Sequence, residues 1–325
     1  MASTASRMPV PQFVPLHHDK AAAVRTELAA GLQASAARTS PKYLYDTLGS
    51  RLFDAITALP EYYLTRTEAA IFARHGAEMA ALVPAGLTLV DLGAGSCDKA
   101  ARLFDLLRPA RYVAVDISMD MLRDALTALQ RQYPALDMVG VGLDFSTQLS
   151  LPAQAGEGPR LVFYPGSSIG NFTPKEALVF LRQARQAAQG GGLLIGVDLV
   201  KPIAVLEAAY DDALGVTAAF NRNLLRHINH LLGSDFEVTH WRHRAHFNVQ
   251  DARIEMHLQA LQDLTVRWPG GQRHFGKGER IHTENSCKYT PSQFEALLRE
   301  AGFSEITQWR DERDWFAVFL AREGG

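Results

Sequence analysis

The sequence predicts an α/β protein, with a doubly wound parallel sheet and a second, smaller α+β domain. Apolar strand-like runs alternate with helical segments from residue 87 to residue 198, as expected of parallel strands linked by crossover helices. A turn with two glycines follows the first run directly, a position typical of nucleotide sites in such sheets. After Pro202 the rhythm changes to a long helical segment and then to alternating stretches, which indicates an inserted unit.

The N-terminal region is predicted to be an arm followed by helices. Residues 1–20 contain three prolines, and we expect an arm whose order depends on packing against another part of the molecule. An alanine-rich segment predicts a helix over residues 20–37, which Ser40-Pro41 ends. Thr65-Arg66-Thr67-Glu68 combines threonine caps with a nearby glutamate, and it predicts the start of a helix that runs to Ala81.

The central region supplies the expected sheet. Strands are predicted at residues 87–91, 111–115, 138–143, 160–164 and 192–198, and helices at 97–108, 118–132 and 174–188. Ser118 is a cap signal for the second helix, and Thr173-Pro174 with Glu176 is one for the third. Gly190-Gly191-Gly192 ends that third helix and returns the chain to a strand.

The rest of the chain is predicted to form an insertion and a closing strand pair. A helical segment reaches about Leu232, and stretches around 236–247, 253–261 and 264–268 indicate an antiparallel meander. A helix at 291–301 and strands at 305–309 and 315–320 would complete the edge of the main sheet. We therefore expect one domain from residues 66–199 and 288–325, and a substrate-binding domain from residues 1–65 and 200–287.

Composition narrows the class of protein. The chain has 325 residues, 47% of them hydrophobic, a formal net charge of −2 and a pI near 6.6, which supports a sizeable core and predicts no nucleic-acid partner. No apolar stretch reaches the roughly 18 residues that cross a bilayer, so no membrane partner is expected. With only Cys97 and Cys287, and no signal-peptide pattern at the N-terminus, we expect a cytoplasmic monomer whose cysteines are buried small hydrophobes.

The glycine turn and two later strand ends predict a site for S-adenosylmethionine. Gly93 and Gly95 let a ligand approach the backbone, and Asp98 replaces the third glycine expected of a pyrophosphate site. Backbone N–H groups at the start of the next helix would suit a carboxylate. Asp116, about 20 residues further on, would accept from ribose hydroxyls, Asp144 and Phe145 would hold adenine, and Lys99 would add a charge. The alternative is that these carboxylates only cap helices.

Three further segments suggest an acceptor site. The loop from Pro165 to Phe172 follows the fourth strand at the carboxyl edge, where catalysis is expected, and its Asn171 can bind an amine or a carboxylate. Alone, Asn171 would more simply be a turn residue. The helix after Tyr210 carries Thr217 and Phe220, which could equally be packing residues. Glu284 and Ser286 lie on one side of an extended segment and could grip a ring such as imidazole.

The histidines of the insertion are expected to be solvated or core residues. They lie on a predicted helix and strand with no accompanying cysteine cluster, so we expect no metal site. These histidines are His227, His230, His240, His243 and His246.

Taken together, the motifs resemble those of the histidine-specific Nα-methyltransferases of ergothioneine biosynthesis, over nearly the whole chain. The resemblance rests on Tyr45-Asp46 with Gly49-Ser50, Leu59-Pro60-Glu61-Tyr62-Tyr63, Thr65-Arg66-Thr67-Glu68, Asp91-Leu92-Gly93-Ala94-Gly95, Gly166-Ser167-Ser168-Ile169-Gly170-Asn171, Tyr210-Asp211-Asp212, Phe220-Asn221-Arg222-Asn223, Arg253-Ile254-Glu255-Met256 and Thr283-Glu284-Asn285-Ser286-Cys287-Lys288. It implies a Rossmann-like class I methyltransferase fold and trimethylation of L-histidine to hercynine with S-adenosylmethionine.

The resemblance also implies a role for each candidate residue. Asn171 and Tyr210 would hold the amine and carboxylate of the amino acid, with Tyr45 facing the growing methylammonium. The remaining acceptor-site residues would be Tyr62, Gly166, Thr217, Phe220, Met256, Glu284 and Ser286, and the donor-site residues Gly93, Gly95, Lys99, Asp116, Asp144 and Phe145. Tyr63-Leu64 and Asn285 depart from the family pattern outside these positions. The alternatives are a related N-methyltransferase acting on another amino acid, such as a tryptophan derivative, a non-catalytic binding protein, and an RNA or protein methyltransferase.

Overall fold

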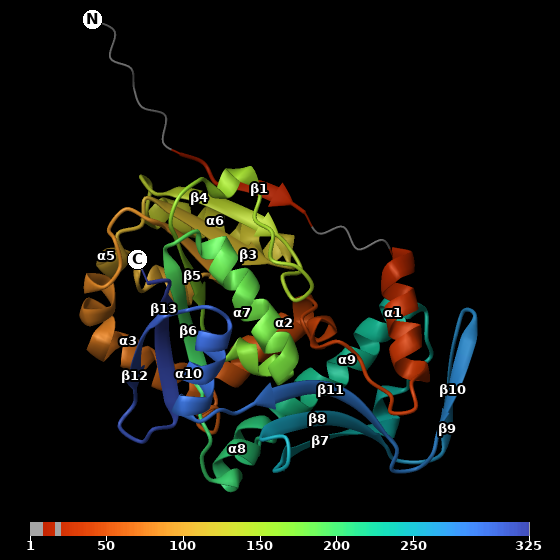
Figure 1. The fold of residues 1–325 in the computed structure, drawn as a ribbon. Coiled ribbons are helices and arrows are strands. Elements are labelled where there is room, and N and C mark those ends of the chain that lie inside the picture. Colours follow the sequence, from red (N-terminus) through yellow and green to blue (C-terminus); the bar gives the residue numbers. More distant parts are fainter. Residues whose placement is uncertain (1–8, 17–20, 325) are drawn as a thin grey trace, which may run out of the picture.

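The computed structural model describes residues 9–16 and 21–324, and in these residues eight strands form one main sheet (Figure 1). The strand order is β1-β4-β3-β2-β5-β6-β13-β12. The strands are β1 (Gln12–Pro15), β2 (Thr88–Leu92), β3 (Arg111–Asp116), β4 (Asp137–Gly142), β5 (Arg160–Tyr164), β6 (Gly192–Asp198), β12 (Glu305–Arg310) and β13 (Phe316–Arg322). The first six pair in parallel, and β13 runs antiparallel to β6 and β12. This is the expected doubly wound, Rossmann-like sheet, with an antiparallel strand pair at one edge.

Helices cover both faces of this sheet because its strands bury both faces. Successive residues of β2 belong to different cores, Leu89 to one and Val90 to the other. We call the main sheet and the helices that accompany it the larger unit. Its helices are α3 (Tyr63–Ala81), α4 (Asp98–Ala101), α5 (Phe104–Leu107), α6 (Met119–Gln132), α7 (Pro174–Ala188) and α10 (Pro291–Glu300), with a short turn η2 (Ala153–Ala155). α3 and α6 pack on one face and α7 and α10 on the other.

The local predictions at the N-terminus and at the helix starts had mixed outcomes. The described part of the expected arm contains β1, which pairs in parallel with β4 (Phe13 opposite Gly140); the rest of that arm lies outside the described residues. Helix α3 begins at Tyr63, with Tyr62 as its cap residue. The threonines at 65 and 67, which were expected to cap it, therefore lie inside the helix. Ser118 caps α6 by position only, because its side chain makes no cap hydrogen bond. Thr173 and Glu176 form the expected capping box.

We call the remaining strands and the helices that accompany them the smaller unit. Its strands form two sheets rather than the single meander that was expected. Its strands β7 (Trp241–Asn248), β8 (Arg253–Ala260) and β11 (Arg280–Cys287) form one antiparallel sheet in the order β11-β8-β7. β9 (Leu264–Trp268) pairs instead with β10 (Gly271–Phe275), a strand that the sequence pattern did not indicate. The unit's helices are α1 (Ala21–Gln33), η1 (Pro41–Leu44), α2 (Thr47–Thr57), α8 (Ile203–Tyr210), α9 (Val216–Leu232) and η4 (Val238–His240).

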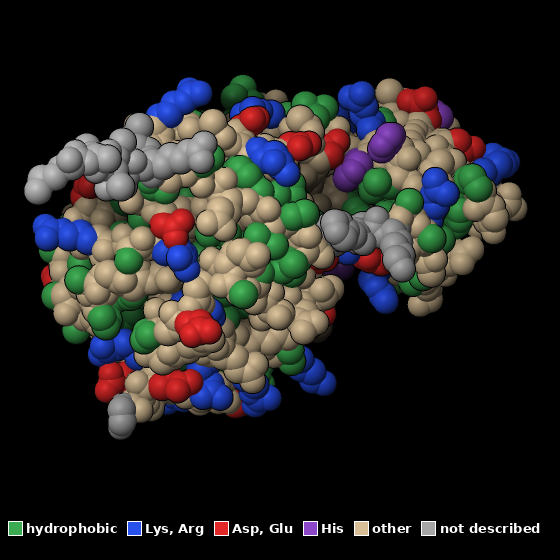
Figure 2. Space-filling view, turned by 90° about the horizontal axis from the view of Figure 1, so that it is seen from above, with side chains coloured by type: hydrophobic (Ala, Val, Ile, Leu, Met, Phe, Trp, Pro, Cys, Tyr) green, Lys and Arg blue, Asp and Glu red, His purple; other side chains and the backbone are tan. Residues whose placement is uncertain are grey.

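The N-terminal helices reach this smaller unit through α9, which packs against α1, α2 and β7. Segments far apart in the chain therefore lie side by side there (Figure 1). On the face seen in Figure 2, lysine and arginine side chains alternate with aspartate and glutamate, without a broad basic patch. Within the described residues, no helix is both long and apolar enough for a membrane span.

Candidate active site

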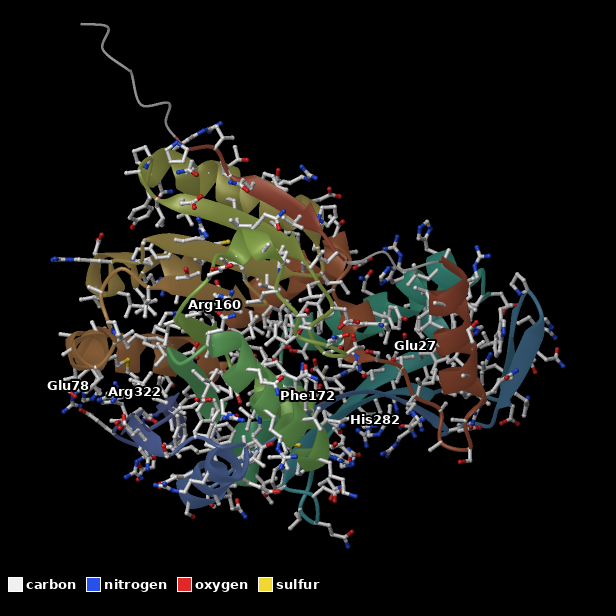
Figure 3. The ribbon with its side chains drawn as sticks, turned by 45° about the horizontal axis from the view of Figure 1, so that its top comes forward. Glu27, Glu78, Arg160, Phe172, His282 and Arg322 are labelled. Atoms are coloured by element: carbon white, nitrogen blue, oxygen red, sulfur yellow. The ribbon has the colours of Figure 1, made fainter. Side chains whose placement is uncertain are left out.

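One cavity collects all ten residues expected for the acceptor site. It lies where the larger unit meets the β11-β8-β7 sheet. Figure 3 labels two residues close to its lining residues in the sequence, Phe172 after Asn171 and His282 before Glu284 on β11. We call it the central cavity, and its lining residues are Tyr45, Phe53, Ile56, Tyr62, Gly166, Ser167, Ser168, Asn171, Ala209, Tyr210, Thr217, Phe220, Met256, Glu284 and Ser286. Five of these were not predicted: Phe53, Ile56, Ser167, Ser168 and Ala209.

Strand geometry explains how β8 and β11 contribute to the central cavity. Glu284 and Ser286 are two residues apart on β11, so both side chains point to the same face. Glu284 pairs directly with Met256 on β8, which brings that side chain to the same wall. A register shift between His282 and Glu284 interrupts the ladder just before these residues, and such irregularities often re-aim side chains at functional sites.

Glu284 is the buried acid of the central cavity. Its Oε1 lies 3.4 Å from Nδ2 of Asn171, which comes from η3 (Ser168–Asn171) after β5. Burial raises the pKa of Glu284 to about 8, and the positive charge of Lys288 opposes this rise. At neutral pH the carboxyl group is therefore mainly protonated, and it can both donate and accept a hydrogen bond.

Aromatic rings form another wall of the central cavity. Tyr45, which follows η1, lies edge-on to Phe53 of α2 and to Phe220 of α9, with 5.6 Å between ring centroids in each pair. Tyr62 lies edge-on to Tyr210 at 6.2 Å. Burial raises the pKa values of Tyr45, Tyr62 and Tyr210 well above their ordinary value, so these phenols stay protonated.

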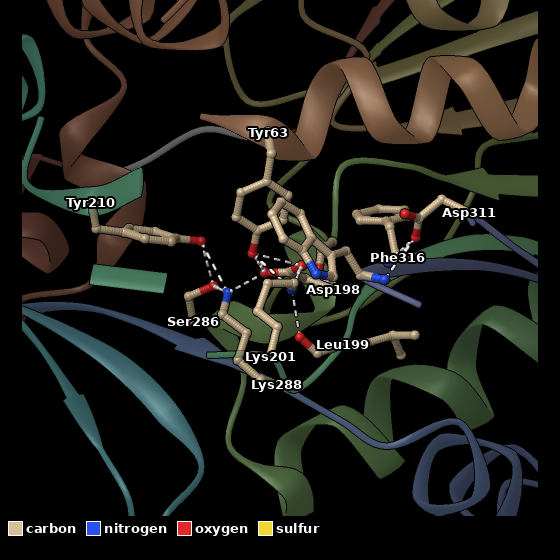
Figure 4. A network of polar contacts seen from close by, with 11 residues as sticks. Tyr63, Asp198, Leu199, Lys201, Tyr210, Ser286, Lys288, Asp311 and Phe316 are labelled. Carbon is tan, nitrogen blue, oxygen red and sulfur yellow. Dashed lines mark hydrogen bonds and ion pairs between the residues drawn. The ribbon is translucent and has the colours of Figure 1, made fainter. Parts of the chain in front are cut away.

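Behind this wall lies a buried network of charged groups (Figure 4). Asp198, at the end of β6, has Nζ of Lys201 2.5 Å from Oδ1 and Nζ of Lys288 2.8 Å from Oδ2. The Tyr63 hydroxyl donates to the same carboxylate at 2.7 Å. Burial lowers the pKa of Lys201 to about 8, against the opposing charge of Asp198. The network holds two lysines and one aspartate, all buried, so removing the aspartate would leave two buried positive charges without a counter-charge.

Lys288 connects this network to the central cavity. Its Nζ donates to Oγ of Ser286 at 2.6 Å and to the hydroxyl oxygen of Tyr210 at 3.2 Å. Those two oxygens are themselves 2.7 Å apart. Ser286 and Tyr210 have one hydroxyl proton each, and the hydrogen bond between their oxygens uses one of the two. The other cannot go to Lys288, because an ammonium group only donates. The second O–H is therefore available to a ligand.

The residues expected for the methyl donor lie at the ends of β2, β3 and β4. We call Gly93, Gly95, Lys99, Asp116, Asp144 and Phe145 the donor edge. Gly93 and Gly95 have φ angles of 71° and 52°, in the left-handed region that favours glycine. Their N–H groups donate to Val115 O and to Oδ2 of Asp116. These glycines therefore offer a ligand a surface without side chains rather than free hydrogen-bond donors.

The helix expected at 97–108 is two single turns, α4 and α5. Cys97 precedes α4 with a φ of 63°, and Arg108 ends α5 with a φ of 46°. A four-residue helix has little macrodipole, so the expected helix-dipole contribution to anion binding is lost.

Asp116 binds two backbone N–H groups but does not cap α6 as the alternative interpretation required, because Ser118 is the cap residue and no side chain makes a cap hydrogen bond there. Its Oδ1 accepts from the N–H of Ser118 at 2.9 Å, at the start of α6, and its Oδ2 accepts from Gly95. Burial raises the pKa of Asp116, while these backbone N–H groups oppose the rise. Each oxygen keeps a second lone pair, so these two contacts do not preclude a bond to a ligand.

Lys99 joins the donor edge to the central cavity. Its Nζ is 2.8 Å from Oε2 of the buried Glu68, whose Oε1 accepts from the N–H of Gly166 at 2.7 Å. Gly166 has a φ of 78°, and a Cβ there would lie 2.8 Å from Nζ of Lys99. Glu68 was predicted only as part of a helix start. Its burial beside Lys99 and Gly166 is the feature that identifies it as a link between the two regions.

Asp144 and Phe145 follow β4 at the far side of the donor edge. Asp144 accepts from Nζ of Lys42 at 3.3 Å and from the Ser146 side chain. A Cβ added to Gly93 would lie 3.8 Å from the Phe145 ring, so this ring faces the glycine turn.

Outside the central cavity, the predicted core residues include a histidine and the two cysteines. His243 is a satisfied core histidine, with Nδ1 2.9 Å from Nδ2 of Asn221 and Nε2 2.8 Å from the carbonyl oxygen of Tyr210. Burial lowers its pKa. Cys97 and Cys287 are both buried free thiols, as expected, and burial raises the pKa of Cys97 to about 12.

Similarity to known proteins extends over almost the entire chain. Residues 24–323 match the family described as histidine-specific methyltransferase, SAM-dependent. The chain is 42% identical to the histidine N-alpha-methyltransferase of Mycolicibacterium smegmatis, covering 93% of this chain and 95% of that protein. It is 29% identical to ergothioneine biosynthesis protein 1 of Neurospora crassa, covering 86% of this chain and 32% of that protein. It is 27% identical to N-methyltransferase dtpB of Aspergillus flavus, with 91% and 87% covered.

Proposed function

We propose that this chain, which belongs to the family of histidine-specific, S-adenosylmethionine-dependent methyltransferases, transfers three methyl groups to the α-amino group of L-histidine and so forms hercynine for ergothioneine biosynthesis. The observation that carries the proposal is the pairing of two chemistries in one cavity. Asn171 and Tyr210 suit an amino-acid head group, and Glu284 with Ser286 suits an imidazole ring.

The proposed pose puts the imidazole ring against β8 and β11. Neutral imidazole has one N–H donor and one nitrogen acceptor, so it needs one partner of each kind. Glu284 and Ser286 together supply them, with Met256 and Tyr62 packing on the ring. Thr217, Phe220 and Gly166 complete the acceptor site in this assignment.

The head group would lie toward the donor edge. Asn171 binds the α-amine through its amide oxygen, and Tyr210 donates its hydroxyl to the α-carboxylate. Methyl transfer to an amine is an in-line displacement, and alignment of the reacting atoms contributes roughly 7–11 kcal/mol to such reactions. Losing a proton from an α-amine whose pKa is about 8 costs about 1.4 kcal/mol per unit at lower pH, which is small beside that gain.

The donor edge has the chemistry that S-adenosylmethionine needs. The bound cofactor supplies an electrophilic methyl group on a sulfonium. In this assignment Asp116 accepts from the ribose hydroxyls, Asp144 and Phe145 bind adenine, and Lys99 pairs with the carboxylate. The open surface at Gly93 and Gly95, with Phe145 facing it, supports this fit.

Each methylation keeps or adds positive charge at the amine, and the cavity must tolerate the product. The faces of aromatic rings stabilise such cations by about 0.5–2 kcal/mol. Tyr45, in contact with Phe53 and Phe220, is the ring assigned to this task.

The second candidate is an N-methyltransferase for another amino acid, such as a tryptophan derivative. The similarity to dtpB of Aspergillus flavus supports this candidate only in the reaction type, N-methylation. An indole offers one N–H donor and no acceptor, so it would leave part of the Glu284–Ser286 pair unused. This favours histidine.

Mass spectrometry of the purified protein with S-adenosylmethionine and an amino acid tests the proposal. With L-histidine we expect products that carry one, two and finally three additional methyl groups. Methylation of a tryptophan derivative or tyrosine without methylation of histidine would establish the second candidate instead. Calorimetric titration with RNA in place of histidine should give no heat of binding, because the chain's net charge is −2 and the face seen in Figure 2 mixes acidic and basic side chains without a broad basic patch.

We also propose that the protein acts as a cytoplasmic monomer on a small molecule. The ten residues expected for the acceptor site surround one cavity within a single copy of the chain, which supports a monomer. Buried free thiols suit a reducing compartment. Sedimentation velocity with and without histidine should give the mass of one chain in both conditions; a dimer would contradict this assignment.

A further inference from the structure

The outer face of the β11-β8-β7 sheet carries a cluster that the proposed reaction does not use. His246 on β7 pairs with Glu255 on β8, and His257 lies two residues further along β8 on the same face. Met256, between them, points to the opposite face and lines the central cavity. The cluster therefore lies back to back with the proposed imidazole site.

Three side-chain atoms of the cluster converge. Oε2 of Glu255 is 3.7 Å from Nε2 of His246 and 3.6 Å from Nε2 of His257. One ligand atom from each of these residues lies within 4.8 Å of the other two. Metal–ligand bonds of about 2.0–2.2 Å require ligand atoms about 3–3.5 Å apart, so small side-chain rotations would suffice.

The second oxygen of Glu255 is already held in place. Oε1 accepts from Nε of Arg253 at 2.8 Å and from Nδ2 of Asn248 at 3.0 Å. This leaves Oε2 directed at the two imidazole rings. Outer hydrogen bonds of this kind orient ligating carboxylates in metal sites.

The imidazole rings are suited to act as ligands. His257 is stacked between the rings of His246 and His282, with centroids 5.3 Å and 4.9 Å away. Burial lowers the pKa of His257 to about 4, so the ring is neutral, the form that binds metals. The side chain of His246 is 41% exposed, which leaves an entry path and room for water ligands.

We propose that Nε2 of His246, Nε2 of His257 and Oε2 of Glu255 bind one divalent transition-metal ion of the zinc and cobalt class. Two imidazole nitrogens and one carboxylate oxygen, with open positions for water, are a donor set that such ions accept. The sequence pattern did not suggest this site because its histidines come from different strands, and spacing within one segment does not bring them together.

Titration of the metal-free, untagged full-length chain with Co²⁺ tests the proposal, because the visible absorption of bound Co²⁺ reports its ligands. We expect one equivalent to bind, and calorimetry with Zn²⁺ to give the same stoichiometry. His246→Ala and Glu255→Gln should each weaken binding at least tenfold. His274→Ala, which removes an exposed histidine from β10, is the matched control and should bind like the natural chain.

Two results would overturn the site. One is a natural chain that binds no Co²⁺ at micromolar concentrations; the other is His246→Ala binding as tightly as the natural chain. Histidine methylation by each variant in the presence of a chelator verifies folding, since none of the three residues lines the central cavity. His246 is the least buried of the three, so His246→Ala decides the question even if substitution at His257 prevents folding.

Discussion

The central cavity and the donor edge meet at Gly166, but they are built in different ways. The donor edge is formed by short turns at the ends of three neighbouring parallel strands. Hydrogen bonds from backbone N–H groups to a carboxylate, such as that of Gly95 to Asp116, hold these turns. The central cavity is formed by side chains from both units, and a buried charge network around Asp198 supports them from behind.

This difference predicts a separation of effects. Changes at the donor edge should weaken the binding of S-adenosylmethionine and leave histidine binding almost unchanged. Changes in the central cavity should do the reverse. Since Lys99 and Glu68 join the two regions at Gly166, only substitutions at that junction should affect both ligands.

The largest separation is expected for Asp116→Ala. The change removes the acceptor of two backbone N–H groups, Gly95 and Ser118, together with the proposed ribose contact. Hydrogen bonds to a charged group contribute about 1.5–3 kcal/mol each, so kcat/KM for S-adenosylmethionine should fall about 100-fold. Calorimetry should find the Kd for histidine changed by less than threefold. Asp120→Ala, an exposed neighbour on α6, is the control, and equal losses for both ligands would refute the separation.

Glu284→Ala should have the next largest effect, on the other ligand. The proposed ring contact is lost and the imidazole keeps an unsatisfied polar group in a buried site, so kcat/KM for histidine should fall at least tenfold. KM for S-adenosylmethionine should stay within twofold. Steady-state kinetics with each substrate varied in turn measure both. An unchanged kcat/KM for histidine would remove Glu284 from the recognition role; Glu300→Ala, at the exposed end of α10, controls for surface charge.

Glu284→Gln tests the difference between the two regions through the pH dependence of the free energy of unfolding. The folded-state pKa of Glu284 is about 8 against 4.5 for the ordinary group. Its contribution to stability is therefore fully present below about pH 4.5 and is lost as pH rises toward 8, because the unfolded chain ionises first. Glutamine has no such loss. The variant's free energy of unfolding, relative to the natural chain, should rise by about 1 kcal/mol or more between pH 5 and pH 8.5.

Thermal unfolding at the two pH values measures this difference. Asp116→Asn provides a contrast on the donor edge, because the backbone N–H groups offset part of the effect of burial on that carboxyl. Its difference from the natural chain should depend less on pH. A pH-independent difference for Glu284→Gln would mean that the buried carboxyl does not take up its proton on folding.

The two regions also differ in how far the sequence alone could predict them. The strand and helix alternation predicted the main sheet, because parallel strands buried on both faces are continuous apolar runs. The donor edge followed from local patterns at Gly93 and Asp116. β1 was missed because it is four residues long and lies between prolines, and its partner β4 is far away in the chain.

For the central cavity, residue patterns gave only separate candidates. The place of Asn171 at the carboxyl edge of the sheet favoured a site over a turn residue, whereas Thr217 could equally have been a packing residue. The family resemblance joined both residues to Glu284. The network around Asp198 and Lys288 was missed because its partners come from α3, from the end of β6 and from the residue after β11, and no local spacing reveals a buried ion pair. β9 was assigned to the meander because alternation indicates a strand but not its partner.

The smallest effect is expected at Tyr45, where the central cavity faces the growing cation. Tyr45→Leu keeps the apolar volume but removes the aromatic face, which stabilises a methylammonium by about 0.5–2 kcal/mol. The third methylation should slow about threefold relative to the first, so dimethylhistidine should accumulate in time courses followed by mass spectrometry. Tyr45→Phe keeps the face and should restore the natural product ratio. Equal slowing of all three steps would indicate a packing role for Tyr45, in line with its contacts to Phe53 and Phe220.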